Sequence, residues 1–479
     1  MNASLMTLEL CVIGLGLALL LADFWTPAGR KKYLAYTAIA ALGGLLIVSF
    51  SDNEVYSLFG GAFINDALAI FFKRLFLMAA ILVLFIAAEF SSRIAAAASE
   101  YYSLILFALA GMLLAASAND FVMLFVSLEL ITITFYVLVS FQRSQIASLE
   151  AGVKYLILSA LSSAFLIFGI ALVWGTTGEM NFTRLAAVAP QFVESKIFLL
   201  GVLLVMVGLG FKIAAFPFQI WAPDVYQGAP TPTTAFLAIG SKAAGFVLLL
   251  RVLFTAIPSV TAHGANLLII ISGLTILYGN LGALPQRNLK RLLGYSSISH
   301  AGFMLLGVAA LSVNGQAAVL YYLAGYLFTV LAAFAVIAIV MNNLDNADIS
   351  GLAGLNRRSP LLAATLAIAM VSLAGIPPLA GFFGKFLLLK AVLEQGPAHP
   401  AYYCLAFTAL VGVAISLYYY FGVVRAIYWS QDVADLSPIQ LSVPAKVFIW
   451  LAIAGIFWLG LFPNTVWNLA LGAVQPLGI

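Results

Sequence analysis

Long apolar runs alternate with short polar stretches along almost the whole chain. Each run has about twenty residues, enough for a helix to cross roughly 30 Å of hydrocarbon. The runs predict spanning helices near residues 5–24, 33–50, 67–90, 101–117, 120–141, 151–175, 196–222, 231–257, 263–284, 290–311, 315–341, 360–393, 401–429 and 444–470. The pattern predicts an all-α integral membrane protein with about 14 transmembrane helices.

Composition supports a membrane protein and excludes several kinds of cofactor and metal site. Hydrophobic residues make up 64% of the 479 residues and charged residues 8%, whereas a soluble domain has about a quarter charged residues. The two cysteines, Cys11 and Cys404, lie in apolar runs and cannot form a four-thiolate cluster. No dinucleotide, phosphate-loop or zinc-protease motif occurs. We expect no redox centre and no metal site in the chain.

The first apolar run is predicted to be a spanning helix and not a cleaved signal peptide. Glu9 interrupts this run, and no basic region precedes it.

Basic residues orient the predicted helices. Alternate connections hold twelve on one side: Arg30, Lys31, Lys32, Arg93, Arg143, Arg287, Lys290, Arg291, Arg357, Arg358, Arg425 and Lys446. The other side holds three: Arg184, Lys196 and Arg251. This bias places both termini on the non-cytoplasmic side of the membrane. Lys73 and Arg74 oppose the bias, and we interpret them as side chains that extend to the interface.

A few ionisable residues lie inside the apolar runs, where a charge is costly unless it is paired or hydrated. They are Glu129, Lys154, Lys212, Lys242, His300 and Lys385, with Lys390 nearer a helix end. Glu129 lies close to the predicted midplane, and a lysine from another helix, Lys212, could keep both groups charged by pairing with it. Breaking such a pair would let the desolvated lysine release its proton. The alternatives are a static ion pair for Glu129–Lys212 and extension to the interface for Lys154.

Proline interrupts two predicted helices beside these lysines. Pro217 follows Lys212 by five residues, and Pro377–Pro378 precede Lys385 in the twelfth helix. Carbonyls freed by a proline inside a membrane need protein or water as partners, and broken helices beside charges mark ion sites in transporters. Broken helices 7 and 12 are therefore expected, the alternative being simple kinks.

Spacing hints at an internal duplication. Glu129 and His300 are 171 residues apart and Lys212 and Lys385 are 173 apart, although Pro217 and Pro377 are 160 apart and break this register. Five helices per interval would give two inverted repeats. The expected division is 1–100 for helices 1–3, 101–262 and 263–430 for the two five-helix repeats, and 431–479 for helix 14.

His300 follows a polar segment that could order water. Tyr295, Ser296, Ser297 and Ser299 precede it, and histidine titrates near neutral pH. The segment could form a water chain, or the histidine could simply be hydrogen-bonded within the bundle.

Three long segments resemble a known family. They are FKIAAFPFQIWAPDVYQGAPTPTTAFLAIGSKAAGF, NLKRLLGYSSISHAGF and SLAGIPPLAGFFGKF. They are similar to the antiporter-like membrane subunits of respiratory complex I, and most similar to the N-type subunits. The resemblance covers essentially the whole chain.

The resemblance implies a function and a set of site residues. It implies proton translocation by Glu129 paired with Lys212, by Lys242 as the link toward the centre, and by His300 leading to Lys385. NADH, FMN, iron–sulfur clusters and quinone would be bound by other subunits, with no cofactor in this chain.

The resemblance also implies partners and a location. These are the other membrane and peripheral subunits of complex I, including neighbouring antiporter-like subunits, in the inner membrane of a bacterial cell; no nucleic acid is involved. A subunit of a multisubunit cation/proton antiporter is the alternative, because it shares the fold and the buried lysines. The segment VYQGAPTPTTAFLAIGSK favours the N-type.

Overall fold

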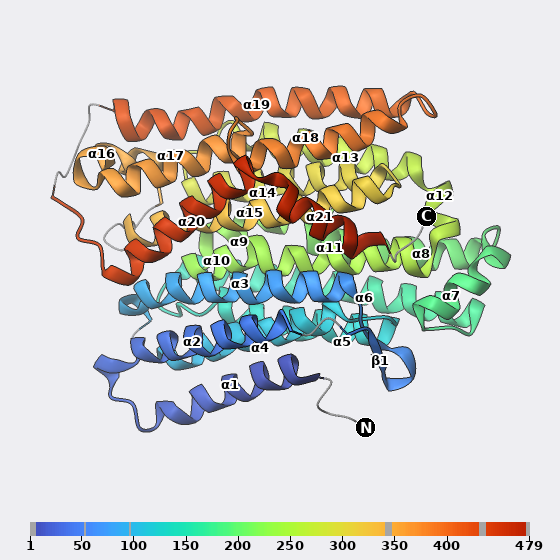
Figure 1. Cartoon of the computed structure of the whole chain (residues 1–479), viewed down its shortest axis with the longest axis horizontal. Coiled ribbons are helices and arrows are strands. Elements are labelled where there is room, and N and C mark those ends of the chain that lie inside the picture. The colour runs from blue at the N-terminus through green and yellow to red at the C-terminus, as the bar shows by residue number, and fades with distance from the viewer. Residues whose placement is uncertain (1–5, 52–53, 95–96, 341–346, 431–436, 476–479) are drawn as a thin grey trace.

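The computed structural model describes residues 6–51, 54–94, 97–340, 347–430 and 437–475 (Figure 1). In this part of the chain the long helices run side by side along the longest axis of the molecule. Twelve of the described helices are long and apolar enough to cross a membrane. The predicted all-α, multi-pass membrane fold is confirmed. The number fourteen stays a prediction, because α1 and α17 are shorter than those twelve, and the predicted first residue of helix 1 lies outside the described part.

The first half of the chain contains helices and one small hairpin. Their bounds are α1 Thr7–Asp23, α2 Lys32–Ser49, β1 Tyr56–Leu58, β2 Phe63–Asn65, α3 Ala67–Glu89, α4 Ala98–Ala116, α5 Phe121–Val139, α6 Ile146–Thr177, α7 Phe182–Val188, α8 Lys196–Ile213, α9 Trp221–Gly228, α10 Thr231–Phe236, η7 Leu237–Ser241, α11 Lys242–Leu250 and η8 Arg251–Ala256. Short 3₁₀ turns occupy Ala28–Arg30, Phe59–Gly61, Ser91–Arg93 and Ala189–Phe192.

In its described residues, the second half consists of helices joined by short connections. Its elements are α12 Pro258–His263, α13 Ala265–Ala283, α14 Leu289–Ala309, α15 Val313–Val340, a 3₁₀ turn at Ile349–Leu352, α16 Leu355–Arg358, α17 Pro360–Ala374, α18 Ala380–Gln395, α19 Ala401–Trp429, α20 Val443–Leu461 and α21 Pro463–Val474. Several helices in both halves begin at a side-chain cap, which satisfies an amide that the first turn leaves free. These caps are Asp66, Asp120, Asn181, Ser195, Asn288 and Ser442.

The centre of the bundle is a helix that the rest of the protein covers on all sides. The segment Thr231–Ala256, which comprises α10, η7, α11 and η8, is buried at every position except Thr255. Its two π-helical stretches, η7 and η8, lie on either side of α11, and the sequence pattern did not predict them. Its neighbours α14 and α15 are also largely buried, whereas only 28% of α2 is buried. Lys242, the first residue of α11, therefore lies in the interior of the protein.

Two helices are interrupted where the sequence carries its prolines. The α8 helix ends at Ile213 with Ala214 in the left-handed conformation, and α9 starts at Trp221. The carbonyl of Phe211, in the last turn of α8, accepts a hydrogen bond of 2.9 Å from the Trp221 indole. In the second half, α17 ends before Gly375, which has φ 89°, and α18 starts at Ala380. A left-handed residue thus ends the first segment of each interrupted helix.

Lys73 does not extend to the interface as the sequence analysis predicted. Its side chain is 3% exposed and forms an ion pair of 2.8 Å with Glu9 of α1, which is 1% exposed. The Lys73 ammonium also donates to Asn65 at 2.9 Å. Arg74 reaches the end of α2, where it donates to the carbonyl of Ser49. The interface interpretation of Lys73 is therefore wrong, because Glu9 and the hairpin supply polar partners inside the protein.

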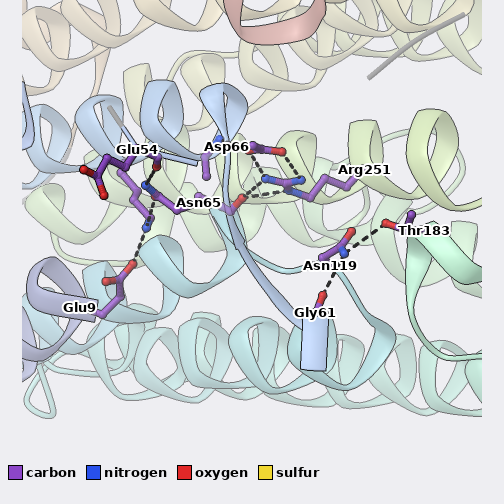
Figure 2. A network of polar contacts seen from close by, with 11 residues as sticks. Glu9, Glu54, Gly61, Asn65, Asp66, Asn119, Thr183 and Arg251 are labelled. Atoms are coloured by element: carbon purple, nitrogen blue, oxygen red, sulfur yellow. Dashed lines mark hydrogen bonds and ion pairs between the residues drawn. The ribbon is translucent and has the colours of Figure 1, made fainter. Parts of the chain in front are cut away.

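A second ion pair lies in the same network (Figure 2). The Arg251 guanidinium is 1% exposed and donates to both carboxylate oxygens of Asp66, at 2.7 and 3.0 Å. It also donates to the carbonyl of Ala116, which ends α4. Burial alone would raise the pKa of Asp66, but the Arg251 guanidinium holds the pKa of this carboxyl below its usual range. Arg251, counted among the connecting residues in the sequence analysis, therefore fixes the end of the central helix against α3 and α4.

Candidate functional site

Glu129 and Lys212 lie in neighbouring hydrogen-bonded groups between α5, α6 and α8. Glu129 is partly exposed and accepts a hydrogen bond of 2.5 Å from Ser163. Lys212 is buried, and its ammonium donates to Thr132 at 2.5 Å and to Ser159 at 2.9 Å. Among the described residues no direct ion pair joins Glu129 to Lys212, so the close pairing expected from the sequence is absent in this structure.

The two groups are nevertheless one helical turn apart. Thr132 follows Glu129 by three residues on α5, and Ser159 precedes Ser163 by four on α6. Residues at these spacings lie on the same helix face, about 5–6 Å apart. The arrangement gives Lys212 a carboxylate in the next layer of side chains and neutral hydroxyls as its direct partners.

Lys242 joins the first half of the chain to the second. Its ammonium donates to the carbonyl of Ser297 on α14 at 2.5 Å and contacts the Ser297 hydroxyl. The same hydroxyl is 2.8 Å from the phenol oxygen of Tyr226 on α9. One turn beyond Lys242, Gly245 packs against the Lys212 side chain, so the helices carrying the two lysines are in direct contact.

His300 connects three helices through tyrosine hydroxyls. Its Nδ1 lies 2.5 Å from the hydroxyl of Tyr322 on α15, and its Nε2 lies 2.9 Å from that of Tyr420 on α19. Tyr420 also lies 2.5 Å from Ser296, one turn before His300 on α14. Each ring nitrogen thus has a hydroxyl that can either donate or accept a proton.

Lys385 belongs to α18, and its side chain reaches back to the interruption between α17 and α18. Its ammonium donates to the carbonyls of Leu373 and Ala374, at 2.8 and 3.0 Å, at the end of α17. A cavity of about 10 Å³ separates this break from His300, with Tyr322, Ser372 and Leu373 in its wall. That volume is close to the minimum for a single water molecule. A water there would lie between the histidine group and the carbonyls that hold Lys385.

Five predicted site residues therefore form a series of buried or half-buried polar groups that extends through both halves of the chain: Glu129, Lys212, Lys242, His300 and Lys385. Counted from the left-handed residue of each break, however, Lys212 precedes its break by two residues and Lys385 follows its break by ten. This explains why lysine and proline spacings disagree in the sequence. The two lysines do not occupy equivalent places.

Several partners in this site were not found from the sequence. These partners are uncharged, so the search for charges in apolar runs could not select them: Thr132, Ser159, Tyr226, Tyr322 and Tyr420.

Lys154 lies outside this buried site. Its side chain is 43% exposed and pairs with Glu150 and Asp224, at 2.7 and 2.8 Å. Asp224 also binds Arg291 at 2.6 Å, which joins α6, α9 and α14 near their ends. Within the described ranges, no three His, Cys, Asp or Glu side chains gather into a group that could hold a metal ion.

Comparison with known proteins shows which family the chain is related to. Residues 118–415 match the family described as "NADH:quinone oxidoreductase/Mrp antiporter, TM". The NADH-quinone oxidoreductase subunit N of Moorella thermoacetica is 38% identical over 472 residues, covering 98% of both chains. The chain belongs to this family.

Solved structures agree with membership in the NADH:quinone oxidoreductase/Mrp antiporter family. A chain of respiratory complex I from Thermus thermophilus with bound aureothin is 34% identical, with a TM-score of 0.80, covering 97% of this chain and 99% of that one. A chain of the Mrp complex from Dietzia sp. DQ12-45-1b has a TM-score of 0.82 at 22% identity, covering 98% and 97%, and shows the shared fold. The resemblance to N-type subunits inferred from the sequence is confirmed by the named relatives.

Proposed function

We propose that the chain is the N-type, proton-translocating membrane subunit of an NADH–quinone oxidoreductase, in which quinone reduction elsewhere drives proton transfer through Glu129, Lys212, Lys242, His300 and Lys385. Relatives named subunit N match it over nearly their full length. A respiratory complex I structure is similar over almost the whole chain.

The observation that carries the proposal is the identity of the hydrogen-bond partners. Among the described residues, Lys212, Lys242 and Lys385 donate only to hydroxyl and carbonyl oxygens. The buried cations Lys73 and Arg251 instead have carboxylate partners. A buried ammonium without a counter-charge is destabilised and can lose its proton, whereas an ion-paired one is held charged.

Each group then has a proposed role in proton transfer. Neutralisation of Glu129 would remove the nearest negative charge from Lys212 and favour release of its proton. Lys242, with Ser297 and Tyr226, would accept protons between the halves. His300 would pass them through Tyr322 and Tyr420 toward Lys385, because imidazole and phenol groups both donate and accept protons. The breaks beside Lys212 and Lys385 are sites where water can satisfy free carbonyls.

The same proposal covers cofactors, partners and location. The chain itself would hold no cofactor, and NADH, FMN, iron–sulfur clusters and quinone would be bound by other subunits. It would lie beside antiporter-like neighbours in a bacterial inner membrane with both termini on the non-cytoplasmic side. The two inverted repeats, 101–262 and 263–430, belong to the proposal as well.

A subunit of a cation/proton antiporter is the second candidate, since the Mrp chain shares the fold. The relatives named subunit N favour the first candidate. The test is reconstitution of the complex that contains this chain into sealed vesicles. NADH oxidation coupled to proton movement is the expected result. Proton flux driven by a sodium gradient without NADH would support the antiporter instead.

A further inference from the structure

Lys290 is a buried lysine that the five-residue site leaves out. It is the second residue of α14, and the sequence analysis counted it among the cations of the cytoplasmic side. In the structure it is 8% exposed, and its ammonium donates to the carbonyl of Ala229 at 2.5 Å. No described carboxylate forms an ion pair with it. Lys290 thus has the same kind of neutral partner as Lys212, Lys242 and Lys385.

A polar cavity lies against Lys290. Its volume is about 120 Å³, and Gln142, Asn288 and Thr231 are in its wall together with Lys290. Two further lining residues, Gln145 and Gln227, are exposed, so the cavity reaches the surface at the ends of α9 and α14. At about 30 Å³ per water molecule, the space admits several waters, and amide and hydroxyl groups supply their partners.

The cavity stops two turns short of the Lys242 group. Lys290 and Ser297 are seven residues apart on α14, which places them on the same face about 10 Å apart. Between them Gly294 packs on Pro223 and Tyr226 of α9, where an added Cβ would lie 3.1 Å from the Pro223 Cα. Tyr226 is the residue whose hydroxyl meets Ser297. The α9–α14 contact therefore separates the cavity from the Lys242 group by one closely packed layer.

We infer that Lys290 is a proton-uptake residue, which takes protons from water in this cavity and delivers them past Gly294 to Ser297 and Lys242. The inference rests on the proposed function. In the step, the neutral amine of Lys290 takes a proton from a hydronium ion in the cavity: one O–H bond breaks, one N–H bond forms, and water is left. The ammonium then gives a proton to a water that enters the α9–α14 contact: one N–H bond breaks, one O–H bond forms, and the amine is restored. The resulting hydronium ion passes its proton through the Ser297 hydroxyl to the neutral amine of Lys242 and is again water.

The competing explanation is structural. Ala229 is the C-cap residue that follows α9, and a lysine that donates to a carbonyl at a helix end stabilises that end. An arginine could serve this role equally well, because it keeps the charge and the donors. It could not serve as a proton carrier, because guanidinium does not lose its proton in proteins.

The experiment compares Lys290→Arg and Lys290→Met in the assembled complex, in inside-out membrane vesicles. We expect NADH-driven proton pumping per assembled complex to fall about ten-fold or more in both, since a positioned proton donor contributes about a hundred-fold or more. Lys446→Arg is the matched control, since Lys446 is an exposed lysine at the start of α20. Normal pumping by Lys290→Arg would overturn the inference, as would normal pumping by Lys290→Met.

A second measurement leaves Lys290 intact. Thr231→Cys in a Cys11→Ser, Cys404→Ser background places a thiol in the cavity wall, and a hydrated cavity should let aminoethyl methanethiosulfonate modify it from the cytoplasmic side. A thiol that remains unmodified in the assembled complex would contradict the inference. Lys385→Ala, measured alongside, distinguishes failure of the Lys290 inference from failure of the proposed function. If Lys385→Ala also pumps normally, the proposed function fails, and not only the role of Lys290.

Discussion

Each buried lysine in this protein is distinguished by the atom that accepts its hydrogen bond. Lys73 faces the carboxylate of Glu9, whereas Lys385 faces the two carbonyls that end α17. A carbonyl dipole stabilises an ammonium less than a full negative charge does, so the two lysines differ in their electrostatic surroundings. The same residue type therefore has a structural role in α3 and a proposed transfer role in α18.

Substitutions of Lys385 separate proton transfer from helix capping. Arginine can donate to the Leu373 and Ala374 carbonyls but cannot release its proton. We expect Lys385→Arg and Lys385→Ala to lower NADH-driven proton pumping alike, by about ten-fold or more. Proton release and the amount of assembled complex are measured in both. Pumping close to wild type in Lys385→Arg, with poor assembly of Lys385→Ala, would identify a capping residue instead.

Glu129 should act through its charge, since Ser163 and not Lys212 is its hydrogen-bond partner. Glutamine keeps a side chain of the same size and loses the charge, so Glu129→Gln should impair pumping. Aspartate keeps the charge at a shorter reach, so Glu129→Asp should impair it less. Vesicle pumping rates divided by NADH oxidation rates give the comparison. If Glu129→Gln is fully coupled, the carboxylate only supports packing of α5 on α6.

The sequence was sufficient to select the lysines but not their partners. A charge in an apolar run is costly wherever it occurs, so Lys212, Lys242 and Lys385 could be found one position at a time. Their partners are uncharged and remote: Lys242 meets Ser297 from 55 residues away, and Lys212 meets Thr132 from 80. Lys290 and Lys73 were assigned to interfaces because only the tertiary structure shows what covers them.

Helices were predicted more fully than the features that interrupt them. Apolar runs locate the spans because length and hydropathy determine what can cross a bilayer. The β1–β2 hairpin and the π-helical stretches around α11 depend on contacts between distant segments, such as the bridge from Phe63 to Ala118. Pro217 lies between α8 and α9, and Pro377–Pro378 lie between α17 and α18, while the broken helices 7 and 12 stay a prediction. The end of α17 became clear only from Gly375 and the Lys385 contacts.

The Asp66–Arg251 pair should hold the central helix in place and should do so over a defined pH range. Removing one partner of a buried ion pair costs about 3–5 kcal/mol, so Asp66→Asn should lower the melting temperature of the solubilised complex. Because Arg251 keeps the pKa of Asp66 below its usual value, the stabilisation is complete above about pH 4 and is lost as the pH falls through the folded-state pKa. The difference in melting temperature between wild type and Asp66→Asn should be constant near neutral pH and shrink only in acid. A difference that disappears by pH 6 would contradict this assignment.

The chain should show no cofactor absorption when it is separated from its partners. Its described residues form a bundle of apolar helices in which no three His, Cys, Asp or Glu side chains gather into a group that could hold a metal ion. We expect the purified polypeptide to retain no flavin, haem or iron and to oxidise no NADH, while the assembled complex does. Absorption spectra and metal analysis of both preparations provide the measurement. Stoichiometric cofactor on the isolated chain would contradict a pump subunit without redox centres.

The burial of Thr231–Ala256 also has a consequence for biogenesis. This segment carries Lys242 and Arg251, so it is a poor candidate to leave the translocon alone into lipid. Its acceptors, Asp66 and the carbonyl of Ala116, are synthesised 185 and 135 residues earlier and can already be in the membrane when Arg251 emerges. Ribosome-bound nascent chains should therefore insert this helix efficiently when α3 and α4 are present. They should fail to insert it when Asp66 is replaced, so the order of the chain is itself part of how the core is built.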